Sequence, residues 1–210
     1  MIELRGKAVA DAHKEALQDK IAAVGDAVIT MAVLLVGSDH GAHMYATFME
    51  KTAKNFGYGF VLRELPETAS HDEVVTALRE LNDDDTVHGI LPLMPMPKHI
   101  DTEVLIDALD PKKDIDGLTT YNIGLVTAGK GGFAPCTAKA CMAILDHYDI
   151  AVEGKHVVVV GRSQVIGKPV AFMTLAAHGT VTICHSRTPD LANYIKQGDI
   201  VIAAAGRPHM

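Results

Sequence analysis

The sequence has 210 residues, of which 48% are hydrophobic, and a formal net charge of −7 with a pI near 5.8. This length and composition predict one large or two smaller globular domains and exclude a disordered chain. The acidic balance and the lack of a basic stripe argue against nucleic acid as a partner. No apolar run approaches the ~20 residues of a membrane span, the start lacks a signal-peptide core, and the cysteines form no CxxC pair, so we expect a cytoplasmic protein with reduced thiols.

A strand followed by a helix is the first pair of elements that the pattern predicts. Residues 28–36 are a continuous apolar run that ends at Gly37, which predicts a buried strand. Residues 42–56 have a helical periodicity, and five side chains are expected on the inner face: Tyr45, Phe48, Met49, Thr52 and Phe56. Tyr45 and Met49 are four residues apart, about one helical turn, so the periodicity alone predicts that they pack together.

Two further strands surround a helix with a clear start signal. Residues 60–65 predict a second strand, and residues 87–93 a third. Between them, Ser70 and Glu73 form a capping box. The helix that it opens has an apolar stripe of Val74, Val75, Leu78 and Leu81. After the third strand we expect a stiff, irregular loop because of three prolines, Pro92, Pro95 and Pro97.

The remainder of the chain continues the alternation. A short helix is expected over 103–109, a loop over 110–124 and a helix over 137–148, with a domain junction near 120–137. Further strands are predicted over 156–160, 181–184 and 199–206, with helices over 172–179 and from Thr188 or Asp190 to Lys196. This order predicts an α/β fold with parallel sheets, helices on both faces, and ligands at the carboxyl ends of the strands.

The stretch VVVVGRSQVIGKP places Gly161, Ser163 and Gly167 between a buried strand and a helix. It is not a GxGxxG sequence, but a tight turn before a helix N-terminus concentrates N–H groups that suit a phosphate. A plain strand–helix connection, in which the glycines serve only the turn, is the alternative.

The end of the next strand bears on the choice of nucleotide. An NAD site places an acidic residue about 20 residues after the turn. Here the strand runs instead into His185, Ser186 and Arg187, and Arg162 lies in the turn itself. A hydroxyl and guanidinium groups suit a 2′-phosphate, so NADP is favoured over NAD; the alternative is that Arg187 is a solvated loop residue.

Several stretches together resemble the bifunctional methylenetetrahydrofolate dehydrogenase/cyclohydrolase family. They are VGSDHGAHMY (36–45), VHGIL and PMPKHID (87–101), DPKKDIDGLT (110–119), PCT (135–137), GRSQVIGKP (161–169) and TICHSRT (182–188). The resemblance implies an N-terminal folate-binding catalytic domain, assigned to residues 1–120, and a Rossmann-type NADP-binding domain, assigned to residues 121–210, with the active site between them. It implies oxidation of 5,10-methylenetetrahydrofolate with NADP, hydrolysis of the product to 10-formyltetrahydrofolate, and a homodimer.

The resemblance also assigns residues. Tyr45 falls on the tyrosine that stacks near the folate, and Asp116 on the aspartate that binds the pterin, whose adjacent N–H donors match a carboxylate. Pro95 and Pro97 are expected beside the substrate. The nucleotide would be held by Gly161, Arg162, Ser163, Gly167, Ser186 and Arg187.

The departures from the family cluster at the residues of the hydrolysis step. Met49 stands at the position of the family lysine and Leu93 at that of the glutamine. Ala42 replaces a serine, and Ala138 and Ala140 replace a proline and a glycine. We therefore expect the dehydrogenase reaction to be permitted and the cyclohydrolase reaction to be lost or weak. The family continues beyond the position of Met210, so the sequence also predicts a shortened nucleotide-binding domain.

Other functions remain open at this point. The chain could be a non-catalytic folate- or nucleotide-binding relative, a fragment of a bifunctional enzyme, or another NADP dehydrogenase in which Asp116 is only a turn residue. Asp39, His40 and His43 lack the further convergent ligand of a structural metal site, so no metal is expected.

Overall fold

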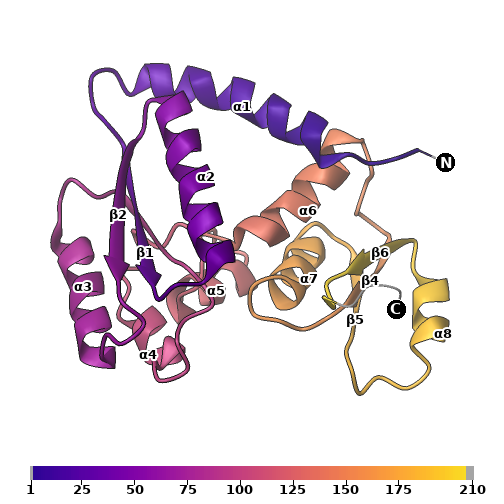
Figure 1. Cartoon of the computed structure of the whole chain (residues 1–210). Coiled ribbons are helices and arrows are strands. Elements are labelled where there is room, and N and C mark those ends of the chain that lie inside the picture. The colour runs from indigo at the N-terminus through magenta and orange to yellow at the C-terminus, as the bar shows by residue number, and fades with distance from the viewer. Residues whose placement is uncertain (1, 207–210) are drawn as a thin grey trace. The chain divides into compact units, whose positions relative to one another are not determined.

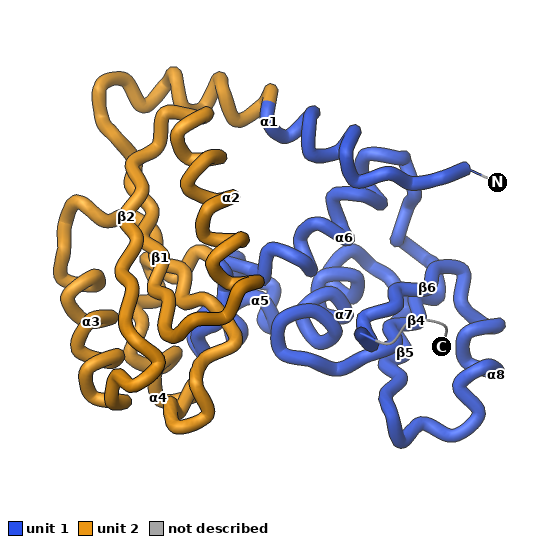
Figure 2. The backbone as a smooth tube through the Cα atoms, in the orientation of Figure 1, with its two compact units in different colours: residues 1–14, 116–210 blue, residues 15–115 orange. Residues whose placement is uncertain are grey.

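The computed structural model describes residues 2–206. The sequence predicts a nucleotide-binding domain that is shortened at its C-terminal end, and this end lies outside the described residues. The chain divides into two units, residues 15–115 and residues 1–14 with 116–210, as Figure 2 shows by colour. Helix α1 (Gly6–Ala23) contributes to both. This helix is absent from the predicted elements, and Val9 is its one buried residue. The assignment of folate binding to residues 1–120 and of NADP binding to residues 121–210 stays a prediction.

The unit of residues 15–115 is built on a parallel sheet with strand order β2-β1-β3. Figure 1 shows its paired strands β1 and β2 side by side. The strands are β1 (Thr30–Val36), β2 (Gly59–Leu65) and β3 (Gly89–Pro92). Side chains of β1 alternate between two apolar clusters: Ala32, Leu34 and Val36 pack with α3 (His71–Asp83) and α4 (Thr102–Asp107), whereas Val33 and Leu35 pack under α2 (His40–Phe56). The predicted α/β class with helices on both faces is confirmed.

The inner face of α2 differs from the prediction. Its buried residues are Ala42, Ala46, Met49 and Ala53, whereas Tyr45 is 53% exposed and Phe48 63% exposed. The prediction was wrong for these two aromatic side chains, and the Tyr45–Met49 pair does not share a buried face. The alanines on the inner face of α2 let the helix pack closely against the sheet. The face that packs is therefore the one with small side chains, and the large apolar side chains lie on another face.

Pro92 belongs to β3 rather than to the loop after it. The amide groups of Ile90 and Leu93 donate in opposite directions, to Lys113 O at 2.7 Å and to Leu34 O at 2.9 Å. The position of Pro92 therefore faces away from β1, where the missing N–H costs no ladder bond. The prolines of this stretch do preclude regular structure beyond residue 92, where Pro95 follows a cis peptide bond.

The second unit holds a parallel sheet with strand order β5-β4-β6. Its strands are β4 (His156–Val160), β5 (Thr180–Cys184) and β6 (Ile200–Ala203). Val157 and Val159 pack with α6 (Cys136–His147) and α7 (Gly167–Ala176), while Val158 and Val160 pack with α8 (Leu191–Gln197).

Two helix boundaries in this unit correct the prediction. Helix α5 (Thr120–Thr127) begins inside the predicted loop, and the Thr119 side chain caps it by accepting from Asn122 N at 3.3 Å. Helix α7 begins at Gly167, five residues before the predicted start. Glycine and proline in its first turn hid this start, although proline is well tolerated there. Every helix described within residues 2–206 is too short or too polar to span a lipid bilayer.

The predicted capping box of α3 is confirmed. Ser70 Oγ accepts from Glu73 N at 3.3 Å, and the Glu73 carboxylate accepts from Ser70 N at 2.7 Å and from Ser70 Oγ at 2.8 Å. These hydrogen bonds lower the pKa of Glu73 below its ordinary value of 4.5. The bond from the Ser70 backbone N–H has the largest effect, and the bond from its side chain comes second.

The Glu73 carboxylate is expected to make stability depend on pH. Because its pKa is lowered in the folded state, its contribution is present above pH 4.5 and is lost as the pH falls through the lowered value. The free energy of unfolding of Glu73→Gln, measured with urea across this range, should therefore differ from wild type most at the higher pH. A difference that does not change with pH would contradict the assignment.

Candidate functional site

Met49 and Leu93, which the resemblance assigns to the positions of the family lysine and glutamine, lie in one apolar cluster. Met49 comes from α2 and is 8% exposed, and Leu93 follows β3 and is 5% exposed. The other buried members are Val33, Leu35, Ala42 and Ala46, with Met31, Phe60 and Leu91 at the border. None of these side chains can donate or accept a proton, so the cluster offers no group for acid–base chemistry.

The other predicted substrate residues of this unit follow the carboxyl ends of its strands. Gly37 follows β1 directly, and Pro97 Cγ lies 3.6 Å from where a Cβ on this glycine would stand. Pro95 is exposed in the same loop, and the exposed Tyr45 lies in the first half of α2. This is the end of a parallel sheet at which ligands bind.

His43 is held by two hydrogen bonds. Its Nδ1 lies 2.9 Å from Asp39 O and its Nε2 3.1 Å from Glu64 Oε1. Both contacts raise the pKa of His43, and the hydrogen bond to the Asp39 carbonyl has a larger effect than the one to Glu64. Among the described residues no group of three or more metal-ligating side chains is found.

Asp116 is tied to the start of a helix distant in sequence. One carboxylate oxygen accepts from the backbone N of Cys136, the first residue of α6, at 3.2 Å. Gly117 follows with φ +63°, and a Cβ there would collide with the carbonyl of Phe133. Asp116 is thus both a turn residue and a half-buried carboxylate at a helix N-terminus. The sequence did not reveal the Cys136 contact because 20 residues separate the two.

The segment just before Asp116 is anchored by Lys113. Its carbonyl accepts from Ile90 N, and its Nζ donates to Asn82 O at 2.6 Å and to Asp84 O at 2.8 Å. A cation at these carbonyls stabilises the C-terminus of α3.

The turn after β4 is tightly built. Gly161 has φ +130°, its N–H donates to Cys184 O at 2.8 Å, and a Cβ on it would collide with the carbonyl of Ala204. Ser163 Oγ accepts from the amide groups of Ile166 and Gly167, at 3.1 and 3.3 Å. The serine that replaces the middle glycine therefore occupies two of the amide groups that the sequence predicts for a phosphate.

The predicted 2′-phosphate residues come to the same sheet edge. Val160 and Cys184 are paired at the ends of β4 and β5, so Arg162 and Arg187, both exposed, follow neighbouring strand ends. The turn at Arg187 is fixed, since its N–H donates to His185 Nδ1 at 3.1 Å. Two guanidinium groups and the exposed hydroxyl of Ser186 provide the donors that a phosphate monoester requires.

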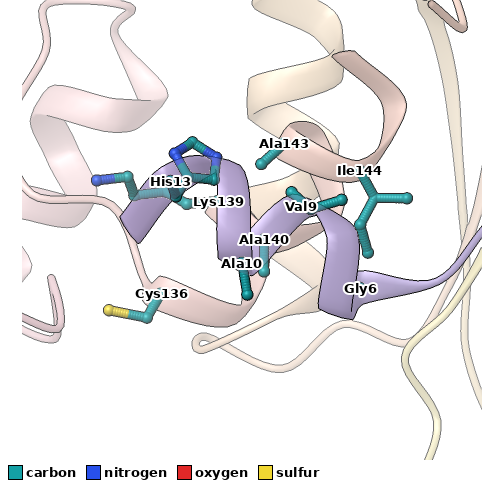
Figure 3. A pocket seen from close by; sticks show the side chains of 9 residues that line it. All are labelled: Gly6, Val9, Ala10, His13, Cys136, Lys139, Ala140, Ala143 and Ile144. Carbon is teal, nitrogen blue, oxygen red and sulfur yellow. The ribbon is translucent and has the colours of Figure 1, made fainter. Parts of the chain in front are cut away.

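A separate cavity of about 360 Å³ lies between the first half of α1 and α6 (Figure 3). It is lined by Gly6, Val9, Ala10, His13, Cys136, Lys139, Ala140, Ala143 and Ile144. None of the residues predicted for substrate or cofactor is among them, so the cavity does not define the predicted site.

Two α/β units with parallel sheets, one of which has a tight turn between a strand and the N-terminus of a helix, define a two-domain α/β protein of the kind that binds nucleotides. Residues 4–116 match the family model of the tetrahydrofolate dehydrogenase/cyclohydrolase catalytic domain, and residues 135–210 match that of its NAD(P)-binding domain. The chain belongs to the tetrahydrofolate dehydrogenase/cyclohydrolase family.

Individual relatives agree with this assignment. The bifunctional protein FolD of Magnetococcus marinus is 43% identical over 208 residues, which are 98% of this chain and 73% of the relative. The crystal structure of the bifunctional FolD enzyme from Campylobacter jejuni has a TM-score of 0.92 at 36% identity, covering 97% of this chain and 73% of that one. The Trypanosoma brucei enzyme, solved with NADP and an inhibitor, has a TM-score of 0.90 at 31% identity, covering 97% and 71%.

Proposed function

We propose that this protein oxidises 5,10-methylenetetrahydrofolate to 5,10-methenyltetrahydrofolate with NADP, and that the cyclohydrolase step of its family is lost or weak. The observation that carries the proposal is the burial of Met49 and Leu93 in one apolar cluster, at the positions of the lysine and glutamine that serve hydrolysis in the family. We further propose a cytoplasmic homodimer in which residues 1–120 bind the folate and residues 121–210 bind NADP.

The dehydrogenase step makes modest demands on the chain. Loss of hydride from the methylene carbon leaves a cation that the two flanking nitrogens stabilise, so alignment matters more than a strong base. Tyr45 supplies a stacking surface for the folate, and Asp116 supplies a carboxylate for the pterin N–H groups. Pro95 and Pro97 would shape the loop beside the substrate.

The nucleotide-binding unit fits NADP. Gly161 leaves no room for a side chain at the strand end, and Arg162, Ser186 and Arg187 offer donors for a 2′-phosphate. Ser163 and Gly167 complete the turn at the start of α7. When bound, NADP supplies the acceptor for the hydride.

Hydrolysis of the methenyl bridge requires more. A water molecule must be activated and a ring nitrogen protonated, which calls for a titratable group beside the bridge. The thioether of Met49 and the isobutyl group of Leu93 can do neither. The product of this chain would therefore be the methenyl compound, which then hydrolyses at its uncatalysed rate.

An assay with two optical signals tests the proposal. Purified protein is mixed with NADP and 5,10-methylenetetrahydrofolate, and NADPH and the methenyl product are followed together. Both should rise in equal amounts at first, and the methenyl signal should then decay no faster than it does without protein. Asp116→Asn, which keeps the size but presents an amide to the pterin, should abolish the signal. Catalysed decay of the methenyl compound would refute the loss of hydrolysis, and folate binding without NADPH formation would identify a non-catalytic relative.

A further inference from the structure

The Asn122 side chain is a buried amide that the proposed reaction does not use. It belongs to α5 and is 2% exposed, and its backbone N–H donates to the hydroxyl of the cap residue Thr119 at 3.3 Å. A buried amide costs free energy unless it is hydrogen-bonded. Its Oδ1 accepts from the backbone N–H of Phe133, which is 11 residues further along the chain, at 3.3 Å. Asn122 therefore attaches the segment of residues 133–136 to the first turn of α5.

The same segment runs against the turn at Asp116 and Gly117. The carbonyl of Phe133 lies so close to Gly117 that a Cβ on this glycine would collide with it. At the other end of the segment, the backbone N–H of Cys136 donates to Asp116 Oδ1 at 3.2 Å. Phe133 is thus held by Asn122 through its N–H, and its carbonyl packs on the turn that carries Asp116.

The orientation of the Asp116 carboxylate depends on this arrangement. One of its oxygens accepts from Cys136 N–H, and the path of residues 133–136 sets the place of that N–H. A carboxylate that binds two adjacent N–H groups of a pterin must present both of its oxygens in a fixed plane. If the segment moved, the hydrogen bond to Asp116 would lengthen and weaken, and the carboxylate could rotate.

We propose that Asn122 is a positioning residue for folate binding, which holds residues 133–136 in place and thereby fixes the Asp116 carboxylate for the pterin. The inference rests on the proposed function, because it takes Asp116 as the group that binds the pterin. Asn122 acts without touching the substrate, since its side chain is buried and bonded to the backbone. All of the residues concerned belong to the unit of residues 1–14 and 116–210.

Binding of tetrahydrofolate and of NADP to the full chain, measured by calorimetry, tests the role of Asn122. Asn122→Leu is similar in size but has no acceptor, so it should weaken tetrahydrofolate by about tenfold and leave NADP unaffected. Asn122→Asp keeps an oxygen that can accept from Phe133 N–H, so it should bind tetrahydrofolate more tightly than Asn122→Leu does. Thr127→Ala is the matched control, because it removes another side-chain hydrogen bond of α5, from Thr127 Oγ1 to Ile123 O at 2.8 Å.

Two neighbouring glycines test the same attachment while Asn122 stays unchanged. Gly131 and Gly132 have φ values of +84° and +91°, so alanine is strained at both positions. A Cβ on Gly132 would lie 2.9 Å from Leu125 Cβ and 3.3 Å from Asn122 Oδ1, whereas a Cβ on Gly131 meets nothing within 4 Å. Gly132→Ala should therefore weaken tetrahydrofolate more than Gly131→Ala does. This pair decides the question if Asn122→Leu does not fold.

Four results would overturn the inference. They are an unchanged affinity of Asn122→Leu for tetrahydrofolate, an equal loss for tetrahydrofolate and NADP, a loss in Asn122→Asp as large as that in Asn122→Leu, and equal affinities of the two glycine variants. Failure of the proposed function looks different, because a wild-type chain that binds tetrahydrofolate but forms no NADPH still gives the comparison of variants. A wild-type chain that binds no tetrahydrofolate would overturn both.

Discussion

Changing Met49 to lysine together with Leu93 to glutamine is expected to raise methenyl hydrolysis by about 10²-fold or more, the usual contribution of a positioned acid–base group. The two side chains belong to one cluster, so a lysine at 49 and a glutamine at 93 would lie within the same apolar surroundings. Burial lowers the pKa of a lysine, which prepares it for proton transfer near neutral pH. The decay of the methenyl absorbance in the presence of each variant measures the effect.

The single substitutions should show that the pair acts as a unit. Met49→Lys alone places an ammonium group among apolar side chains, and Leu93→Gln alone places an amide there, so each should lower the free energy of unfolding by about 1–3 kcal/mol. Their effects should not add, because the residues lie in one cluster. The volume-conserving pair Met49→Leu and Leu93→Met is the control, and neither hydrolysis nor stability should change much. A double variant that folds, binds tetrahydrofolate and gains no hydrolysis would show that other parts of the site have also changed.

Gly161→Ala is expected to lower the free energy of unfolding by about 2–4 kcal/mol and to weaken NADP binding by about tenfold. The added Cβ would collide with the carbonyl of Ala204, which follows β6, and φ +130° is unfavourable for alanine. The turn would have to move away from the ends of β4 and β6, and Arg162 would move with it. Urea unfolding and calorimetry with NADP measure the two effects.

Gly154→Ala is the control that distinguishes the cost of a positive φ from the cost of the collision with Ala204 at Gly161. Gly154 also has a positive φ, +71°, but a Cβ there meets nothing within 4 Å. Its substitution should cost only about 1 kcal/mol and leave NADP binding unchanged. Equal losses in the two variants would mean that the close approach at Gly161 is not what shapes the turn.

The features that the sequence predicted well are those that neighbouring residues determine. The strand runs of β1 and β4 and the Ser70–Glu73 capping box depend on a few adjacent side chains, and the structure confirms them. Helix α5 was missed because the stretch before it, DPKKDIDG (110–117), contains aspartates, a proline and a glycine, which together predict a loop. Its cap, Thr119, is not followed by an acidic residue that would have completed a capping box.

Features that depend on distant residues could not be predicted. The helical periodicity of residues 42–56 predicted that Met49 is buried, but it could not show that Met49 and Leu93 lie in the same apolar cluster. The exposure of Tyr45 and Phe48 follows from how closely α2 approaches β1, which hydrophobicity alone does not reveal. The contact of Asp116 with Cys136 depends likewise on the folded path of the chain. The roles of these residues in binding stay predictions.

The anchoring of Lys113 sets how much variation in length the chain can tolerate. Its carbonyl and its ammonium group fix the backbone only three residues before Asp116, which is itself bonded to Cys136. One inserted or deleted residue between Lys113 and Asp116 would break one of these attachments. The glycine-rich segment at residues 129–132 is exposed, so we expect natural length differences to collect there.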